Sequence, residues 1–347
     1  MALNLTFSAC DKKVSQIETR DKSVVYVVGY ETNAQGKSVA TLWKNGKSQY
    51  LTNGSNNASA NSIFVLDNDL YTSGSEVVTV KRHNHYLDEE NETEEMRPII
   101  WKNGNSQRIS LGDKEDDEDA MEINASANSV YVYGNNDVYV TGIGSTWAGG
   151  NSSEEWSWIW KNGTLQFIKS GINASASCIQ VSGGDVYVSG HGMEWPRNQG
   201  RVAIYSFATL WKNGSPQRLS NSRRMATANA VFVSDGDVYV AGDEENAHNI
   251  LVATLWKNGT AQLLGEGENH SYAKSVYVID GEVYVAGYEN CGEKGQWVNN
   301  SIATLWVNGS AQRLGDGKNP SVANAVFVLD KDVYILQSRV FISRFLA

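Results

Sequence analysis

The chain has 347 residues, with 39 Asp and Glu against 29 Lys and Arg, and its formal net charge is −10. This balance argues against a nucleic-acid-binding protein, because binding to a phosphate backbone depends on a Lys- and Arg-rich surface. Aromatic residues make up 10% of the chain and there are only four prolines, which is not the composition of a disordered protein. No apolar run reaches the length of a membrane-spanning helix.

The first residues leave two interpretations open. The segment TFSACDKK (6–13) resembles the end of a bacterial lipoprotein signal, with Cys10 as the lipidated residue. Only nine residues precede Cys10, and ALNLTF (2–7) is short for the apolar part of a signal peptide and lacks a basic segment before it. The segment is therefore a truncated signal or a chance likeness. We expect an extracellular, periplasmic or surface-attached protein. The three cysteines, Cys10, Cys178 and Cys291, have neither metal-ligand spacing nor a disulfide framework.

Short strands of alternating polarity follow along the whole chain. VSQIE (14–18) is a weak first strand, and three stronger strands follow at 23–29, 40–44 and 48–51. Five complete four-stranded units then begin near Ser62, Ser129, Cys178, Ala230 and Ser275. Three last strands are expected at 324–328, 332–336 and 339–345, so this unit lacks a fourth strand. Residues 2–7 would fill that place and close the last unit.

One heptapeptide, ATLWKNG, recurs at 40–46, 208–214 and 253–259, with close variants in the other units. Its tryptophans, Trp43, Trp101, Trp160, Trp211, Trp256 and Trp306, are 45 to 59 residues apart, a period typical of propellers and repeat arrays. The Asn-Gly pair predicts a type I′ hairpin turn, which requires positive φ at both residues. Four antiparallel strands per unit describe a propeller blade. The sequence thus predicts an all-β, seven-bladed β-propeller in a single domain over 1–347, with six blades as the alternative. Because a blade is covered on both sides, the repeated tryptophans are expected to pack between blades.

The stretch ATLWKNGTAQLLGEGENHSYAKSVYVIDGEVYVAGYE (253–289) resembles the extracellular repeat proteins of the HAF type. Those proteins alternate an (A/H)-x-L-W-x-x-G segment, a Leu-Gly turn and an Ala-rich run leading into a V-x-G strand. The resemblance implies a propeller-like, secreted or cell-surface protein. It implies no catalytic residues.

Long inserts concentrate at one end of the predicted blades, in the loops between the second and third strands and in the crossovers to the next blade. Such loops on a rigid scaffold commonly carry function. Exposed aromatic residues suit sugar stacking or a protein contact, unless the loops use them to pack on one another. The candidate ligand-binding residues are Trp147, Trp156, Trp195, Trp297, Tyr86, Tyr205, His191, His248 and His270.

Two acidic runs, 88–95 and 113–122, also lie among these inserts. They suit a Ca²⁺ site, with Asp116, Asp117 and Asp119 as candidate ligands, or the attraction of a cationic partner, or a solvated charged loop. His83-x-His85 is a weak chelating pair. Apart from this Ca²⁺ possibility we expect no cofactor.

No hydrolase, metalloprotease or phosphate-binding motif occurs in the sequence. We therefore expect a monomeric, non-enzymatic propeller that binds a carbohydrate or protein ligand through its insert-rich face. A propeller glycosidase or lyase with scattered carboxylates near a central channel is the alternative, and a purely structural repeat protein is a third possibility.

Overall fold

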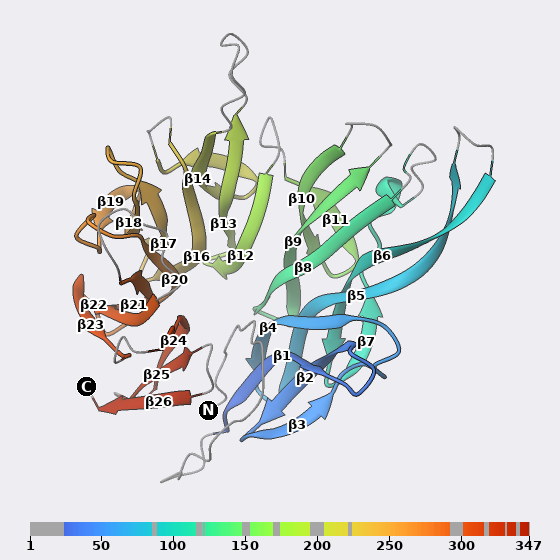
Figure 1. Cartoon of the computed structure of the whole chain (residues 1–347), viewed down its shortest axis with the longest axis horizontal. Coiled ribbons are helices and arrows are strands. Elements are labelled where there is room, and N and C mark those ends of the chain that lie inside the picture. The colour runs from blue at the N-terminus through green and yellow to red at the C-terminus, as the bar shows by residue number, and fades with distance from the viewer. Residues whose placement is uncertain are drawn as a thin grey trace. The chain divides into compact units, whose positions relative to one another are not determined.

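The computed structural model describes residues 24–84, 89–115, 120, 122–147, 153–168, 174–194, 205–220, 224–291, 301–315, 319–329, 332–337 and 341–346. Within these ranges the chain forms seven antiparallel sheets in chain order, five of four strands and two of three (Figure 1). The fold is an all-β, seven-bladed β-propeller, as predicted, and the six-blade alternative is wrong. Residues 2–7 and Cys10 lie outside the described residues, so the closure by an N-terminal strand stays a prediction.

The strands follow the predicted hairpin order. The first sheet contains β1 (Tyr26–Thr32), β2 (Ser38–Lys44) and β3 (Lys47–Tyr50); the second contains β4 (Ala58–Leu66), β5 (Asp69–Asn84), β6 (Glu89–Lys102) and β7 (Asn105–Arg108). A short 3-10 helix, η1 (Gly112–Lys114), precedes the third sheet, which contains β8 (Glu122–Tyr133), β9 (Asp137–Trp147), β10 (Ser153–Lys161) and β11 (Thr164–Phe167).

Four further sheets complete the described chain. They comprise β12 (Ala174–Ser182), β13 (Asp185–Glu194), β14 (Tyr205–Lys212) and β15 (Ser215–Arg218); β16 (Ala226–Ser234), β17 (Asp237–Glu245), β18 (Leu251–Lys257) and β19 (Thr260–Leu263); β20 (Ser271–Ile279), β21 (Glu282–Asn290), β22 (Ser301–Val307) and β23 (Ser310–Arg313); and β24 (Ala323–Leu329), β25 (Asp332–Gln337) and β26 (Phe341–Leu346). Among the described residues, no helix has the length and hydropathy to cross a bilayer.

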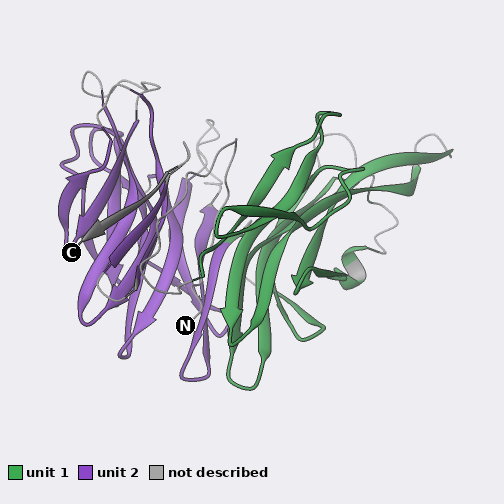
Figure 2. Cartoon of the chain, turned by 90° about the horizontal axis from the view of Figure 1, so that it is seen from below, with its two compact units in different colours: residues 1–11, 18–168, 173–176 green, residues 12–17, 169–172, 177–347 purple. Residues whose placement is uncertain are grey.

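Two compact units divide the chain, one made mainly of residues 18–168 and the other mainly of residues 177–347 (Figure 2). Unit 1 contains the first three sheets and the start of β12, and unit 2 contains the rest of β12 and the sheets that follow. The expectation of a single domain over 1–347 stays a prediction.

Five of the six repeated tryptophans are buried; Trp43 is the exception, because it is only partly buried and its indole Nε1 donates to Glu31 of its own sheet at 3.3 Å. Trp256 of β18 is fully buried among residues that include Tyr187 and Leu210 of the preceding sheet, and Trp306 of β22 packs in the same way on residues of its preceding sheet that include Leu255. Trp101 is buried too, and its indole Nε1 donates to the carbonyl of Leu51 at 3.1 Å. The five buried tryptophans are therefore core residues, as the repeat pattern predicted.

Each Asn-Gly turn has positive φ at both residues, for example 51° at Asn258 and 81° at Gly259. The Asn258 side chain closes the turn, because its Oδ1 accepts the backbone N–H of Val238 at 2.9 Å and its Nδ2 donates to Asp237 Oδ1 at 2.8 Å. Lys257 binds the other Asp237 oxygen at 2.7 Å and lies 5.1 Å from the ring centroid of Tyr239. These contacts lower the pKa of Asp237.

The same Asp–Tyr–Lys–Asn network occurs at the same end of four sheets. The aspartates of these networks are Asp69, Asp137, Asp185 and Asp237. In the sixth sheet Val307 stands at the lysine position, and Glu282 stands in place of the aspartate and accepts a hydrogen bond from Tyr284. The carboxylates of the four aspartates are therefore each bound by the asparagine and the lysine of the adjacent hairpin.

A β-bulge explains the glycine near the end of the second strand. The register of β16 and β17 shifts between Ala228 and Ala230, so that Asn229 is the extra residue. A Cβ on Gly242 would lie only 1.9 Å from the carbonyl oxygen of Thr227. Equivalent glycines in three other sheets face the same contact with a strand-one carbonyl: Gly74, Gly142 and Gly287. The backbones thus approach too closely for any side chain at this position.

The first acidic run is not a solvated loop: from Glu89 onward it belongs to strand β6. Glu94 is exposed, whereas Glu95 is fully buried and binds two arginines, Arg82 at 3.0 Å and Arg97. The backbone N–H of Ile123 also donates to Glu95 at 2.9 Å. Glu95 therefore links the second and third sheets, whereas Glu89, Glu90, Glu92 and Glu94 are exposed. Asp116, Asp117, Asp119 and His85 lie outside the described residues, and the described part of the chain contains no cluster of three or more potential metal ligands.

Two substitutions at Asn258 should separate backbone strain from side-chain hydrogen bonding. Asn258→Gly keeps positive φ at no steric cost and removes the hydrogen bonds to Val238 and Asp237, so we expect a loss of about 1 kcal/mol in the free energy of unfolding. Asn258→Ala adds the left-handed strain of a Cβ, about 1–2 kcal/mol more. Urea unfolding followed by tryptophan fluorescence measures both variants, and equal losses would contradict the explanation.

Neutralising Glu95 should cost far more than neutralising its neighbour. Glu95→Gln leaves Arg82 and Arg97 close together without their shared counter-charge, and breaking a buried ion pair costs about 3–5 kcal/mol. The exposed Glu94→Gln is the matched control and should leave the free energy of unfolding nearly unchanged. Similar urea midpoints for the two variants would show that the buried network contributes little.

Candidate functional site

Six of the sequence-predicted binding residues lie within the described ranges. Trp147 and Trp156 belong to unit 1, and the other four belong to unit 2. Trp195, Trp297 and Tyr86 lie outside the described residues. The locations of the six decide which of them can meet a ligand in this structure.

The two tryptophans of unit 1 differ in exposure. Trp147 ends β9 and is 41% exposed, as a ligand platform requires. Trp156 is 6% exposed, and its indole Nε1 donates to Thr146 Oγ1 at 3.1 Å. Its ring also lies over Gly144, where a Cβ would be 2.3 Å away. Trp156 is thus part of the core, and it packs within the protein instead of facing a ligand.

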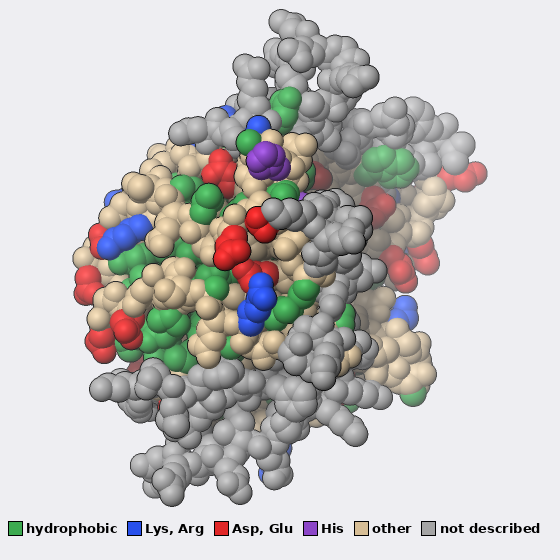
Figure 3. Space-filling model, turned by 60° about the vertical axis from the view of Figure 1, so that its left-hand side comes forward, with side chains coloured by type: hydrophobic (Ala, Val, Ile, Leu, Met, Phe, Trp, Pro, Cys, Tyr) green, Lys and Arg blue, Asp and Glu red, His purple; other side chains and the backbone are tan. Residues whose placement is uncertain are grey.

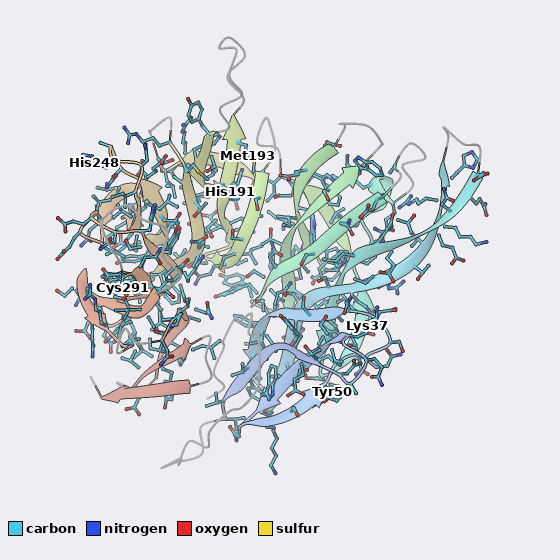
Figure 4. All side chains as sticks on the ribbon, in the orientation of Figure 1. Lys37, Tyr50, His191, Met193, His248 and Cys291 are labelled. Carbon is cyan, nitrogen blue, oxygen red and sulfur yellow. The ribbon has the colours of Figure 1, made fainter. Side chains whose placement is uncertain are left out.

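The histidines of unit 2 occupy three environments. His248 is exposed in the turn between β17 and β18, whereas His191 is half-buried on β13, close to Met193 (Figure 4). His270 is 2% exposed, and its Nδ1 accepts the backbone N–H of Leu251 at 3.0 Å. Burial lowers the pKa of both His191 and His270. Tyr205 is half-buried at the start of β14. His270 therefore ties two strands together, and His191, His248 and Tyr205 retain accessible surface.

A cluster that the sequence did not predict lies between the fifth and sixth sheets, within unit 2. We call it the Asp243 cluster; it contains Thr227, Asn229, Asp243, Tyr272, Lys274 and Tyr288. Asp243 follows Gly242 on β17 and is only 4% exposed. The Thr227 side chain and Asn229 Nδ2, the latter at 3.3 Å, hydrogen-bond its carboxylate. Asp243 is therefore a buried acid held in place by neutral donors.

Burial raises the pKa of Asp243 to about 6, against the opposing effects of the Lys274 charge and of the two hydrogen bonds. Tyr272 and Tyr288 face each other across β20 and β21, with ring centroids 4.6 Å apart, and Lys274 Nζ lies 5.8 Å from the Tyr272 centroid. Burial and then nearby negative charge, including Asp243, raise the pKa of both tyrosines. The cluster thus combines a carboxyl, an amide, an ammonium group and two aromatic rings.

The β-bulge places these groups. In three sheets the bulge asparagine donates to a carbonyl of the next sheet: Asn61 to Ala127, Asn128 to Ala176 and Asn229 to Ala273, at 2.8 to 3.1 Å. In the sixth sheet Lys274 occupies the bulge position, between Ala273 and Ser275. The cluster therefore lies beside a bulge that has lysine in place of the asparagine.

A sequence signal for the cluster existed in the departures from the repeat. The residue after the strand-two glycine takes five identities in the six units that have this glycine: Tyr30, Ser75, Ile143, His191, Asp243 and Tyr288. Lys274 and Ser177 likewise depart from the asparagine that four other units have at the bulge position. The composition of the loops pointed to histidines and tryptophans. The strand-end residues can be recognised only when the units are compared position by position.

The surroundings of the cluster are mixed and acidic. Figure 3 views the molecule from the side on which β18–β23 lie in Figure 1 and shows Asp and Glu side chains among hydrophobic and polar ones, with a histidine near the upper part. Glu245 accepts the backbone N–H of Met225 at 3.1 Å, and Met225 is 53% exposed. Glu289 pairs with Arg313 at 3.1 Å. These carboxylates disfavour an anionic ligand.

Removing the Asp243 charge should change how stability depends on pH. The folded state holds this proton up to about pH 6, whereas the unfolded chain loses it near pH 4, so the folded protein loses stability relative to the unfolded chain as the pH rises between these values. Compared with Asp243→Asn, the wild type should lose about 2 kcal/mol of unfolding free energy between pH 4 and pH 7. Asp237→Asn is the control: because the pKa of Asp237 is lowered, its contribution changes mainly below about pH 4, where it is lost as the pH falls, and it should change little between pH 4 and pH 7. A difference between wild type and Asp243→Asn that does not change with pH would refute this.

The comparisons with known proteins support the fold. No protein-family model and no curated protein matches the chain significantly. A puromycin-hydrolysing peptidase of Mycobacterium tuberculosis is structurally similar at 10% identity, with a TM-score of 0.51, over 92% of this chain and 51% of the peptidase chain. The chain therefore spans about half the length of that protein.

Two further solved structures are more distant. The β-propeller domain of the Trilobed protease from Pyrococcus furiosus is 12% identical, with a TM-score of 0.47, over 97% of this chain and 94% of that domain. A Bombyx mori β-fructofuranosidase mutant in complex with sucrose is 12% identical, with a TM-score of 0.33, over 93% of this chain and 85% of the enzyme. At such identities the likeness concerns the fold alone.

Proposed function

We propose that this propeller is a non-enzymatic binding protein that recognises a carbohydrate or protein ligand through the insert-bearing ends of its sheets. One observation carries the proposal: the two ends of the sheets differ in kind. At one end four sheets repeat the same Asp–Tyr–Lys–Asn network, in which the polar groups bind one another. At the other end the residue after the strand-two glycine changes from sheet to sheet. Variation on a rigid scaffold is typical of a recognition surface.

The chemistry at the variable end suits binding. Trp147 is 41% exposed, and His191, Tyr205 and Tyr288 are half-buried, so aromatic surface is accessible in several sheets. Aromatic side chains supply contact area, and their polar groups supply orientation. The protein's net charge of −10 favours neutral or cationic ligands over anionic ones. The HAF-type resemblance implies a secreted or cell-surface location, where the protein would have access to such ligands.

Catalysis by a glycosidase or lyase would need a second carboxyl near a first one of raised pKa, separated by about 5 to 9.5 Å. Asp243 has the properties of the first, since its pKa is raised to about 6. The nearby Glu245 is occupied by the backbone N–H of Met225. This arrangement supports binding over turnover, and the enzymatic alternative becomes an outcome of the test below.

A glycan array and a phage-displayed peptide library, each probed with the purified full chain, test the proposal. Binding should fall at least tenfold in the triple variant Trp147→Ala, Trp195→Ala, Trp297→Ala. The control is Tyr50→Ala, which removes an aromatic side chain that is 61% exposed on the outer strand β3. Binding to glycans or peptides without product release supports the proposal.

Two other outcomes would count against it. Hydrolysis or elimination of a bound glycan that stops in Asp243→Asn would favour the glycosidase or lyase alternative. A wild type that binds neither glycans nor peptides would remove the basis for a recognition role of this end. Equal binding by wild type and triple variant would exclude the three tryptophans from the binding site.

A further inference from the structure

The Asp243 cluster has the composition of a sugar-binding site. Only 4% of the surface of Asp243 is exposed, and the groups around it are polar. A carboxylate accepts about four hydrogen bonds, and the described donors to it are the Thr227 side chain and Asn229 Nδ2. The Asn229 contact is long, at 3.3 Å. Asp243 therefore has capacity for further donors.

The donors and acceptors around Asp243 complement hydroxyl groups. Lys274 is half-buried and belongs to the next sheet, and its charge acts on Asp243. An ammonium group donates only and a carboxylate accepts only, whereas a sugar hydroxyl does both. Adjacent hydroxyls of one ring can thus donate to Asp243 and accept from Lys274. An anionic ligand would meet the buried carboxylate, and an isolated amine would compete with Lys274 for it.

The aromatic part of the cluster supplies the apolar surface. Tyr272 and Tyr288 stack with an interplanar angle of 23°, and both rings are half-buried. Aromatic rings commonly combine apolar contact with a polar group, and here the two hydroxyls extend the polar set. The cross-strand pairing of β20 and β21 holds both rings in place, so little conformational entropy is lost on binding.

We propose that the Asp243 cluster binds a neutral hexose unit of a carbohydrate, with Asp243 and Lys274 contacting adjacent hydroxyls and Tyr288 contacting the apolar face of the ring. This inference rests on the proposed binding function and assigns it a ligand class and a position. It concerns residues of unit 2 alone. The site arises where Lys274 replaces the repeated asparagine and Asp243 follows the strand-two glycine.

Titration calorimetry with neutral gluco-, manno- and galacto-oligosaccharides, selected by array, tests the assignment on the full chain. Asp243→Asn keeps the shape of the side chain, relieves a buried charge and is expected to fold. It should weaken binding of the selected oligosaccharide at least tenfold, and so should Tyr288→Ala. Asp237→Asn, on the same strand but at the repeated end, should bind as the wild type does. Oligouronides should bind at least tenfold more weakly than neutral oligosaccharides.

The possible failures are distinguishable. If a neutral oligosaccharide binds equally to wild type and Asp243→Asn, or if an oligouronide is the preferred probe, the hexose site is wrong and the proposed function stands. The same holds if only peptides bind. If neither glycans nor peptides bind, the proposed function itself fails.

Discussion

A close contact between the first and second strands, present at Gly74, Gly142, Gly242 and Gly287, is the constraint on which these four sheets and their junctions depend. A carbonyl of the bulged first strand occupies the space where a strand-two residue would carry its Cβ, as Thr227 does at Gly242. The bulge directs one extra side chain toward the next sheet, and Asn229 uses it to bind Ala273. The same contact places the residue after the glycine, Asp243, beside that junction. A packing requirement and a chemical site thus have one origin.

The two ends of a sheet share the same strands, but they differ in how far their side chains depend on one another. At the Asn-Gly end of four sheets, turn geometry, an ion pair and a ring contact hold each group through another. The ion pair is missing in the sixth sheet, where Val307 and Glu282 replace the lysine and the aspartate. It is also missing in the first sheet, where Lys44 lies over Tyr26 but Val24 stands at the aspartate position. At the opposite end the side chain after the glycine has no such partner requirement within the hairpin. Chemical diversity therefore accumulates there.

Local rules explain what the sequence could predict. The Asn-Gly turns follow from the energy of positive φ, and the burial of Trp256 and Trp306 follows from a blade that is covered on both faces; both predictions are confirmed. Contacts between residues far apart in the sequence are harder to predict, because a single sequence does not show which residues meet. The effect of the Lys274 charge on Asp243 across two sheets, the ion pair of Glu95 with Arg82 within one sheet, and the packing of Trp156 on Gly144 within another all depend on such contacts. Composition left the run that contains Glu95 open between a Ca²⁺ site, a cationic partner and a solvated loop, and made Trp156 a candidate for ligand binding or for packing between loops.

The division of contacts has a consequence for how such a chain can lengthen. The Asp–Tyr–Lys–Asn network is complete within one hairpin pair, so a copied segment of about 50 residues carries all of it. The tryptophan and the bulge asparagine instead each supply one half of a contact whose other half is a backbone carbonyl or an aliphatic surface present in every copy. A duplicated segment can therefore form both contacts with its neighbouring sheets at once. Later mutation can change the end of its second strand without removing those contacts. Duplication depends on the residues that make the contacts between sheets, whereas substitution can change the residues at the end of the second strand.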